Sequence, residues 1–253
     1  MIDIHSHILF GVDDGPSNKN ETIEMFESAI KEGITEIVST SHVIHPQYNA
    51  AANVVKERLV ILQNDIQEQQ IPLKLHLGHE IRLRDDLVEL LKENKLYTLA
   101  GSKYLLLELP SHEVPQYTIN IVQELISESY IPIIAHPERN KAIAEKPSKL
   151  ANLINQGAIA QITSGSLAGK FGKKIQRLSL QLVDANLVHT YGSDAHNLTN
   201  RPFLFDEGLT YLENSKRLDA VDIFLENNAR IIEDKEVIIL EQNEIQKKKW
   251  WKF

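Results

Sequence analysis

Residues 1–7 read MIDIHSH, a short apolar run that ends in two histidines. Positions i and i+2 of an extended strand point to the same side of a sheet. His5 and His7 can therefore reach one metal ion together from the end of a first strand. A lone histidine is more often a core or surface residue, so this pair alone leaves a metal site and a structural role about equally open.

Short apolar runs alternate with longer amphipathic stretches along the chain, which is typical of βαβ units and a parallel sheet. We expect strands at residues 2–5, 36–39, 73–77, 104–108, 131–135, 158–162 and 187–191. We expect helices near residues 20–32, 50–69, 84–93, 116–128, 147–155, 171–185 and 203–214. The pattern predicts an α/β fold and favours a closed barrel over an open sheet, although periodicity alone does not decide between them.

Composition excludes several classes of function. The formal net charge of -8 argues against a nucleic-acid-binding protein, which usually carries a basic face. The sequence has no cysteine, so a cysteinyl-phosphate mechanism is excluded, and any metal must be held by His nitrogen and carboxylate oxygen. The first residues lack the pattern of a signal peptide, and no apolar run is long enough to span a bilayer. We therefore expect a cytoplasmic protein.

Ionisable side chains follow nearly every expected strand. The active site of a βα barrel lies at the C-terminal ends of its strands, so these side chains should converge. Asp194 and His196 repeat the i, i+2 spacing of the first pair. After the first strand, the candidates in chain order are His42, Glu80, Glu108, His136, Asp194 and His196. The strand at 158–162 is the exception, because Thr163, Ser164 and Ser166 follow it.

Two arginines come directly after candidate ligands, Arg139 after His136 and Arg201 after His196. A guanidinium can bind a phosphate group through two parallel hydrogen bonds. An isolated arginine is usually a surface residue, so a phosphate site and a surface position are both open for each. Turn chemistry and a functional role are likewise both open for Asp13 in DDGP, residues 13–16. The remaining histidines are expected to be structural or exposed: His45, His76, His79, His112 and His189.

Taken together, these motifs resemble the PHP (polymerase and histidinol phosphatase) metal-dependent phosphoesterases. Among them, the chain is most similar to the CpsB/CapC-type bacterial tyrosine-protein phosphatases of capsule and exopolysaccharide loci. The matching segments are MIDIHSHILFGVDDGP (1–16), STSHVIHPQY (39–48), GHEIRL (78–83), YLLLELP (104–110), IPIIAHPERN (131–140), QITSGSLAG (161–169) and GSDAHNLTNRP (192–202). The resemblance implies a distorted, TIM-like seven-stranded α/β barrel over residues 1–233, followed by a charged tail at 234–253.

The resemblance also implies a site with three divalent metal ions, manganese being expected and iron, zinc or magnesium being alternatives. One ion would be held by His5, His7, Glu80 and Asp194. A second would be held by Glu80, Glu108 and His136, with Glu80 bridging, and the third by Asp14, His42 and His196. The expected catalytic residues are Arg139 and Arg201, which would bind the phosphate, together with His42, His136 and His196.

The implied reaction is hydrolysis of phosphotyrosine by a water molecule that the metals activate, without a phospho-enzyme. The phenolate of tyrosine leaves readily, because its conjugate acid has a pKa of about 10. The implied substrate is the tyrosine-rich tail of an autophosphorylating bacterial kinase, whose dephosphorylation would regulate polysaccharide synthesis. That kinase works at the membrane, so we expect this protein near the inner face of the membrane.

Two further interactions are open at this point. The end of the chain, KKKWWKF (247–253), combines lysines with aromatic residues and could make weak contact with a membrane surface, the alternative being a solvated tail. The apolar content of the helices near 20–32 and 203–227 would permit an oligomer.

Two other functions also remain open, namely a small-molecule phosphatase such as histidinol phosphatase and a non-catalytic, metal-stabilised regulator that binds the kinase.

Overall fold

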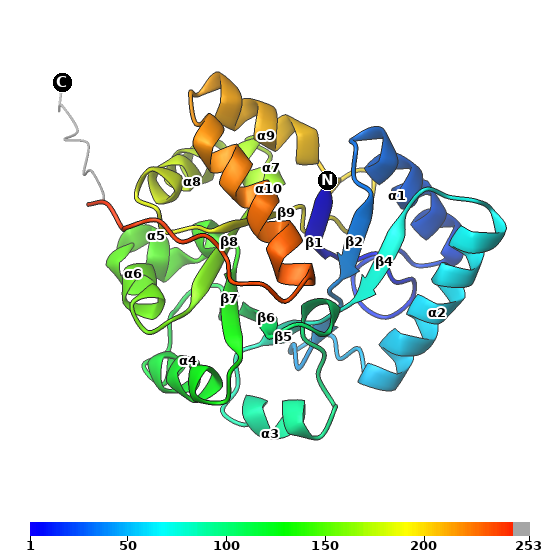
Figure 1. Ribbon diagram of the computed structural model, residues 1–253, viewed down its shortest axis with the longest axis horizontal. Helices are drawn as coiled ribbons and strands as arrows, with labels where there is room; N and C mark the ends of the chain where they lie inside the picture. The colour runs from blue at the N-terminus through cyan, green and yellow to red at the C-terminus, as the bar shows by residue number, and fades with distance from the viewer. Residues whose placement is uncertain (245–253) are drawn as a thin grey trace.

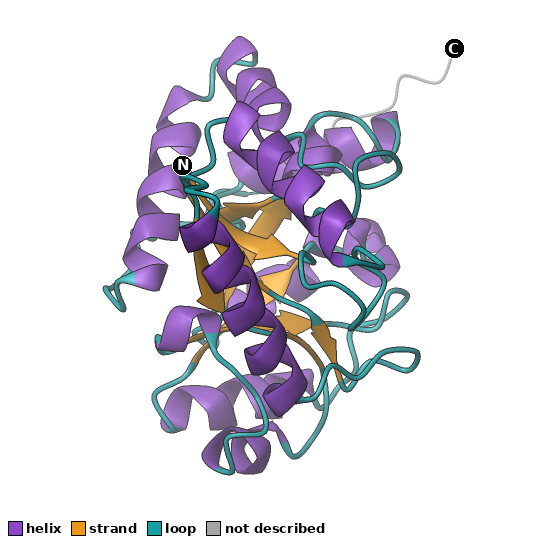
Figure 2. Ribbon diagram, turned by 90° about the vertical axis from the view of Figure 1, so that its right-hand side faces the viewer, coloured by secondary structure: helices purple, strands orange, loops and turns teal. Residues whose placement is uncertain are grey.

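A ring of parallel strands surrounded by helices forms the protein, in a computed structural model that describes residues 1–244 (Figures 1 and 2). The strands are β1 (Ile2–Ser6), β2 (Glu36–Ser39), β3 (His42–Val43), β4 (Lys74–Leu77), β5 (Glu80–Arg82), β6 (Tyr104–Glu108), β7 (Ile131–Ala135), β8 (Ile159–Thr163) and β9 (Thr190–Gly192). They form two parallel sheets, one in the order β1-β2-β4 and one in the order β3-β5-β6-β7-β8-β9.

The ring closes where the last strand meets the first. The backbone N–H of Asp194 donates to the carbonyl of His5 at 2.7 Å, and that of His7 donates to the carbonyl of Ala195 at 2.8 Å. Ser6 and Ala195 also form a parallel bridge. The expected barrel is therefore confirmed, and its closing seam lies directly beside the candidate ligands of both chain segments.

The second and third barrel strands continue past a break into short segments, β3 and β5, that were not predicted, and these breaks distort the barrel. The second strand is interrupted at residues 40–41, between β2 and β3, and the third at residues 78–79, between β4 and β5. The short helix η1 (Leu99–Gly101) packs against both β4 and β6. Gly78 is required at one break, because a Cβ there would lie 2.8 Å from a methyl group of Val38 and 3.1 Å from one of Leu99.

The helices surround the strands in the order α1 (Lys19–Lys31), α2 (Ala52–Glu68), α3 (Leu87–Lys92), α4 (Thr118–Ser127), α5 (Lys141–Glu145), α6 (Ser148–Ile154), α7 (Ser164–Leu167), α8 (Lys173–Asp184), α9 (Phe205–Asn214) and α10 (Leu218–Ile232), with the short η2 (Pro137–Arg139) before α5. The expected helices are present, α5 and α7 were not predicted, and α10 extends beyond the helical stretch expected near 203–227. The strand expected at 187–191 begins later, because Leu187 still donates to the carbonyl of Leu182 at the end of α8.

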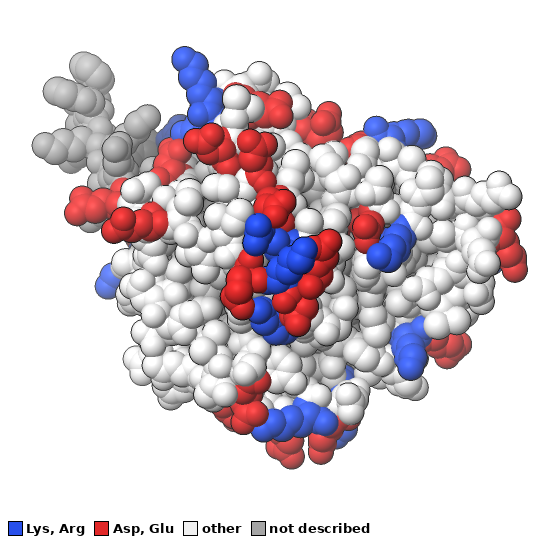
Figure 3. Space-filling model, in the orientation of Figure 1, with Lys and Arg blue, Asp and Glu red and all other residues white. Residues whose placement is uncertain are grey.

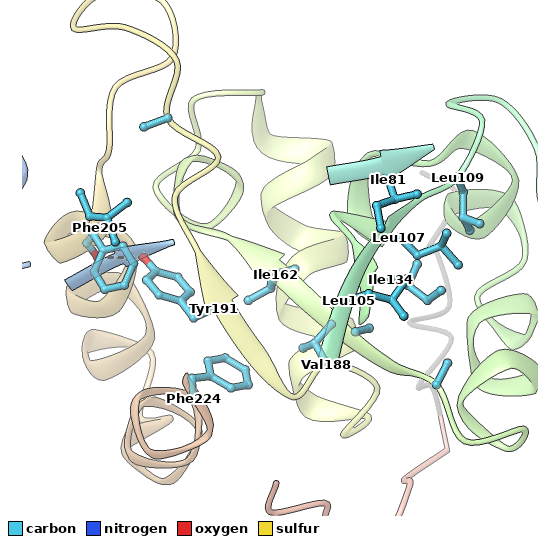
Figure 4. Close-up of a cluster of buried hydrophobic side chains, with 14 of the residues drawn as sticks. Ile81, Leu105, Leu107, Leu109, Ile134, Ile162, Val188, Tyr191, Phe205 and Phe224 are labelled. Carbon is cyan, nitrogen blue, oxygen red and sulfur yellow. Dashed lines mark hydrogen bonds between the residues drawn. The ribbon is translucent and has the colours of Figure 1, made fainter. Parts of the chain in front are cut away.

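Hydrophobic side chains fill both sides of the strands. On β6, Tyr104 and Leu106 belong to a cluster inside the ring, whereas Leu105 and Leu107 belong to the larger cluster under the helices (Figure 4). A strand buried on both faces is typical of parallel sheets. Helix α10 lies across the strands in Figure 1 and contributes Ile231 to the inner cluster. This helix covers the N-terminal end of the barrel, so the C-terminal strand ends are left for a site.

The described part of the expected tail, residues 234–244, lies against the barrel. Tyr104 donates its hydroxyl proton to the carbonyl of Lys235 at 2.7 Å, and the backbone N–H of Asn243 donates to the carbonyl of Ala185 at 3.0 Å. The segment KKKWWKF (247–253) lies outside the described residues. The proposal that it touches a membrane therefore rests on the sequence alone.

Residues 1–244 contain no helix that is both long enough and apolar enough to cross a membrane. Figure 3 shows the charged side chains on the face that Figure 1 presents, and basic and acidic groups are intermixed there. A polyanion approaching this face would therefore meet carboxylates as well as cations.

Burial of His189 predicts a sensitivity of the fold to acid. Burial lowers the pKa of His189 to about 4, and one ring nitrogen accepts the backbone N–H of Ala160 at 3.2 Å. Because the folded-state pKa lies below the unfolded value of about 6.5, this histidine favours folding above that pH, and the contribution is lost as the pH falls toward 4. At pH 5 the loss should be about 2 kcal/mol.

We therefore expect the free energy of unfolding to fall less between pH 7 and pH 5 in His189→Gln than in the unsubstituted protein, as measured by denaturant titration without metal. The exposed His112→Gln variant is the control and should follow the unsubstituted protein. An equal pH dependence in all three proteins would contradict the argument.

Candidate metal centre

The C-terminal ends of the barrel strands bring all the predicted ligands to one place. β1 ends at Ser6, so His5 and His7 lie on either side of its last residue, while Glu108 closes β6 and His136 follows β7. The breaks in the second and third strands place His42 at the start of β3 and Glu80 at the start of β5. The chain beyond β9 adds Asp194 and His196. All of these side chains are buried except His136, which is partly buried, as is Asp14.

The first predicted set forms a compact group. His5, His7, Glu80 and Asp194 place one ligand atom each within 4.8 Å of one another. The Nε2 atom of His5 lies 3.2 Å from Asp194 Oδ1 and 3.5 Å from Glu80 Oε2, and His7 Nε2 lies 3.3 Å from Glu80 Oε2. Two imidazoles and two carboxylates thus face a common point, as a divalent ion requires.

The third predicted set is also brought together, with one addition. Asp14, His42 and His196 form a group that includes His7. Asp14 Oδ1 lies 3.2 Å from His196 Nε2 and 3.6 Å from His42 Nε2. His7 lies at the junction of both groups, because its ring stacks on that of His196 at 3.8 Å between centroids.

The second predicted set differs from the arrangement in the structure. His136 Nε2 lies 2.8 Å from Glu80 Oε1, as expected for ligands of one ion. Glu108, however, groups with Glu80 and His42 in place of His136, and it also pairs with Arg82 at 3.0 Å. Glu80 belongs to two of the groups, which fits the bridging role expected for it.

Buried polar atoms without partners provide a test of whether metals fit. Unpaired carboxylate oxygens and ring nitrogens cost several kcal/mol when they are buried unless a cation compensates them. Six atoms of the groups above are buried and make no hydrogen bond among the described residues: Glu80 Oε2, Asp194 Oδ1, Asp14 Oδ1, Glu108 Oε2, His42 Nδ1 and His196 Nε2. Arg82 compensates Glu108 Oε2 at 3.0 Å, whereas the other five face imidazoles or carboxylates of the same groups, as donor atoms that share a cation do. Imidazole and carboxylate donors suit manganese, iron and zinc. The residues present therefore fit divalent metal ions.

Two side chains outside the groups orient the first two histidines. Asp13 Oδ2 lies 2.9 Å from His7 Nδ1 and accepts the backbone N–H of His42 at 3.0 Å. Gln161 Oε1 lies 2.9 Å from His5 Nδ1. Each contact turns the Nε2 atom of its histidine toward the candidate metals, as outer-shell partners of metal ligands commonly do.

The sequence analysis left both a turn and a functional role open for Asp13, and it did not single out Gln161. The signal that could have identified Gln161 is a polar residue between the apolar Ala160 and Ile162 at the centre of β8. The residues at the end of β8 include neither a carboxylate nor an imidazole. This strand therefore contributes to the site through Gln161, which contacts His5.

A buried carboxylate at the closing seam holds β1 against the segment after β9. Asp3 Oδ1 accepts the backbone N–H groups of Ser193, at 2.9 Å, and His5, at 3.2 Å. Burial raises the pKa of Asp3 to about 6, although these hydrogen bonds act in the opposite direction. Asp194 itself has a φ of 55° and His136 a φ of 33°, both in the left-handed region that non-glycine residues rarely adopt. Such strain is concentrated at functional sites.

The two predicted arginines meet at one carboxylate. Arg201 Nη2 lies 2.7 Å from Asp194 Oδ2, and Arg139 contacts the same oxygen. Burial alone would raise the pKa of Asp194, but the two guanidinium groups hold it well below its usual range. The guanidinium of Arg139 also lies over the ring of Phe171, 5.2 Å from its centroid. Two cations side by side next to the candidate metals form a site suited to a dianion.

Most of the other histidines have structural partners, as expected. His76 pairs with Glu36 at 2.6 Å, His79 accepts the backbone N–H of Tyr97 at 3.0 Å, and His112 is exposed. His45 differs from the expectation of a merely structural residue, because its ring stacks on the candidate ligand His42 with centroids 4.6 Å apart.

Known proteins resemble this chain over its whole length. A family model described as capsular polysaccharide synthesis, CpsB/CapC, matches residues 1–233. CapC of Staphylococcus aureus is 42% identical over 256 residues, with 99% of each chain covered. The tyrosine-protein phosphatase YwqE of Bacillus subtilis is 38% identical over 253 residues, with 100% of each chain covered.

Solved structures support the same assignment. One chain from crystal structures of YwqE from Bacillus subtilis and CpsB from Streptococcus pneumoniae, described as metal-dependent tyrosine phosphatases, overlaps with a TM-score of 0.94 and 38% identity. The match covers 98% of this chain and 100% of that chain. A variant of organophosphorus hydrolase from Deinococcus radiodurans, 12% identical with a TM-score of 0.58, covers 91% of this chain and 92% of that chain and shares the fold alone. The protein belongs to the CpsB/CapC family of capsular polysaccharide synthesis.

Proposed function

We propose that this protein is a metal-dependent protein-tyrosine phosphatase. The observation that carries the proposal is the convergence of buried imidazoles and carboxylates with two arginines at one end of the barrel. The whole-length similarity to YwqE, which is named as a tyrosine-protein phosphatase, gives the substrate class. In this proposal three divalent ions, manganese in the first place, are held by His5, His7, Asp14, His42, Glu80, Glu108, His136, Asp194 and His196.

Bound divalent ions would supply positive charge to the phosphate oxygens and lower the pKa of a coordinated water molecule. The side chains of the protein orient the phosphate and the metal-binding histidines. Arg139 and Arg201 orient the phosphate and stabilise the charge that its oxygens carry in the transition state. Asp13 and Gln161 hold His7 and His5 in one orientation and one tautomer. The tyrosyl phenolate, with its pKa of about 10, leaves without the help of a strong general acid.

The physiological substrate that we propose is the phosphorylated tyrosine-rich tail of a bacterial kinase that controls polysaccharide export. The family description, capsular polysaccharide synthesis, supports this context. We accordingly place the protein in the cytoplasm, at the inner face of the membrane where such a kinase acts. Hydrolysis of a small phosphomonoester such as histidinol phosphate, and a non-catalytic regulatory role, are the alternatives that the first experiment below separates from this proposal.

Removal and replacement of the metals tests the activity. The chelated protein should lose hydrolysis of a phosphotyrosine peptide, and addition of Mn²⁺, Mg²⁺, Fe²⁺ or Zn²⁺ one at a time should restore it, with the greatest rate in Mn²⁺. With each of the four ions, Glu80→Ala should hydrolyse the phosphotyrosine peptide at least about a hundredfold more slowly than the unsubstituted protein, because the substitution removes a carboxylate shared by two groups. Faster turnover of histidinol phosphate, or full activity in Glu80→Ala, would overturn the proposal.

The contact between Asp13 and His7 predicts a second effect on the metals. Asp13→Asn keeps the shape of the side chain but removes the charge that orients His7. We expect metal affinity or activity to fall by about 10- to 100-fold, as for other outer-shell partners of ligating histidines. Metal titration followed by an activity assay measures this, with the exposed Asp85→Asn as the control. If metal affinity and activity were both unchanged, the inference that Asp13 orients His7 for metal binding would be wrong.

The phosphate role of the arginines predicts a different signature. Arg201→Lys keeps the positive charge but loses the planar pair of donors that fits a phosphate. We expect kcat/KM for the phosphotyrosine peptide and the affinity for inorganic phosphate to fall by about tenfold or more while the metal content stays unchanged. Elemental analysis and inhibition by phosphate measure the two quantities. A loss of metal without a loss of phosphate affinity would show that Arg201 acts on the ligands alone.

A further inference from the structure

A cavity of about 650 Å³ opens beside the candidate metal centre. Its wall is formed by the segment that follows β3, the first residues of α2, and residues in and just after α3. The volume falls in the range typical of ligand sites, which is about 300–1,000 Å³. None of the residues that line it belongs to the candidate ligands or to the two phosphate-binding arginines.

His45 separates this cavity from the metal centre. It lines the cavity, and its ring stacks on that of His42 with the centroids 4.6 Å apart and the planes at 22°. On the other side, Asp14 lies 3.6 Å from His42 and 3.4 Å from Arg201. Direct contacts therefore connect the phosphate-binding end of the site with the cavity, one side chain after another.

The segment between β3 and α2, which contains His45, has a strained backbone. Ile44 has a φ of 61°, which is an outlier for a β-branched residue. Its backbone N–H donates to Asn49 Oδ1 at 3.0 Å, and the backbone N–H of Ala50 donates to the carbonyl of His42 at 2.9 Å. The ring of Tyr48 stacks on both histidine rings of this segment. These contacts fix the conformation of the loop that forms one wall of the cavity.

The lining of the cavity combines apolar side chains with polar ones of little net charge. The apolar residues are Val43, Ile44, Ala51, Ala52, Leu90 and Leu96. The two permanent cations of the lining are already paired with carboxylates, since Arg84 pairs with Asp86 and Lys95 with Glu93, each at 2.6 Å. The side-chain amides of Asn53 and Asn94 also line it and can bond to a peptide backbone. This chemistry fits an uncharged side chain better than an acidic one.

We infer that the cavity is a subsite for the substrate polypeptide, and that it receives an uncharged aliphatic or aromatic side chain close to the phosphotyrosine. An extended peptide advances about 3.3 Å per residue. The contacts from Arg201 through Asp14 and His42 to His45 place the cavity next to the phosphate site, so a residue adjacent to the phosphotyrosine is the one that would enter it. The subsite selects proteins by sequence, whereas the metal centre would act on any phosphomonoester that reaches it. This inference rests on the phosphatase activity proposed above.

Filling the cavity tests the inference. Ala51 is exposed at the cavity wall, so Ala51→Trp should obstruct the subsite without touching the centre. For a phosphotyrosine peptide with leucine on both sides of the phosphotyrosine, KM should rise about tenfold, since burial of one aliphatic side chain is worth at least that factor. Hydrolysis of phenyl phosphate, which has no flanking residues, should keep its kcat and KM. In the unsubstituted protein, replacing both leucines by aspartate should raise KM similarly.

Val60→Trp is the matched control, because Val60 is 46% exposed on α2, the helix that begins directly after Ala51, and does not line the cavity. It should leave the kinetics of both substrates unchanged. Equal peptide kinetics in Ala51→Trp and the unsubstituted protein would overturn the subsite, as would a preference for the aspartate peptide. Failure of the phosphatase activity itself would appear differently, as absence of phenyl phosphate hydrolysis in all variants.

Discussion

The structure depends on a buried cluster of carboxylates in which arginines pair with Asp194 and Glu108, whereas Glu80 faces imidazoles. Glu80 has no exposed surface, and it lies among the imidazoles of His5, His7, His42 and His136. Burial alone would raise the pKa of Glu80, but the neighbouring imidazoles, His5 foremost, hold it well below its usual range. A fold that keeps carboxylates ionised at its centre is suited to divalent cations, whose binding offsets the cost of desolvation. The rest of the molecule can be understood as the scaffold for this cluster.

The departures from a regular barrel position the candidate ligands. The break between β4 and β5 places Glu80 at the start of a new strand segment, beside His42, which starts the other one. The strained backbone of His136 and Asp194 turns two further ligands inward at the points where the chain leaves β7 and β9. At the opposite end, α10 and the inner hydrophobic cluster supply the stability that this polar end does not.

Local patterns in the sequence predicted an α/β fold and most of the clustered side chains, whereas the distorted seven-stranded barrel and the ligand Asp14 were expected from the family resemblance. Strand periodicity located six of the seven barrel strands closely, and the position after each strand indicated the ligands. The sequence-based predictions were wrong or incomplete where the interaction that decides the structure joins residues far apart in the chain. The strand expected from residue 187 starts at Thr190, because hydrogen bonds at the end of α8 take the preceding residues. Gln161, the grouping of Glu108 with His42, and the stacking of His45 depend on which strands become neighbours, and one sequence does not reveal that.

The closing seam between β1 and the segment after β9 has a consequence for how the protein matures. Two of the groups combine histidines from the first strand with Asp194 or His196 from beyond the last one, and Asp3 ties the same two segments together through Ser193. A nascent chain that has not yet emerged past this point therefore lacks two of the three clusters, however much of the barrel has formed. Contacts between segments so far apart in sequence also form late, because closing a long loop costs entropy. Two of the three groups are therefore complete only when the ring has closed.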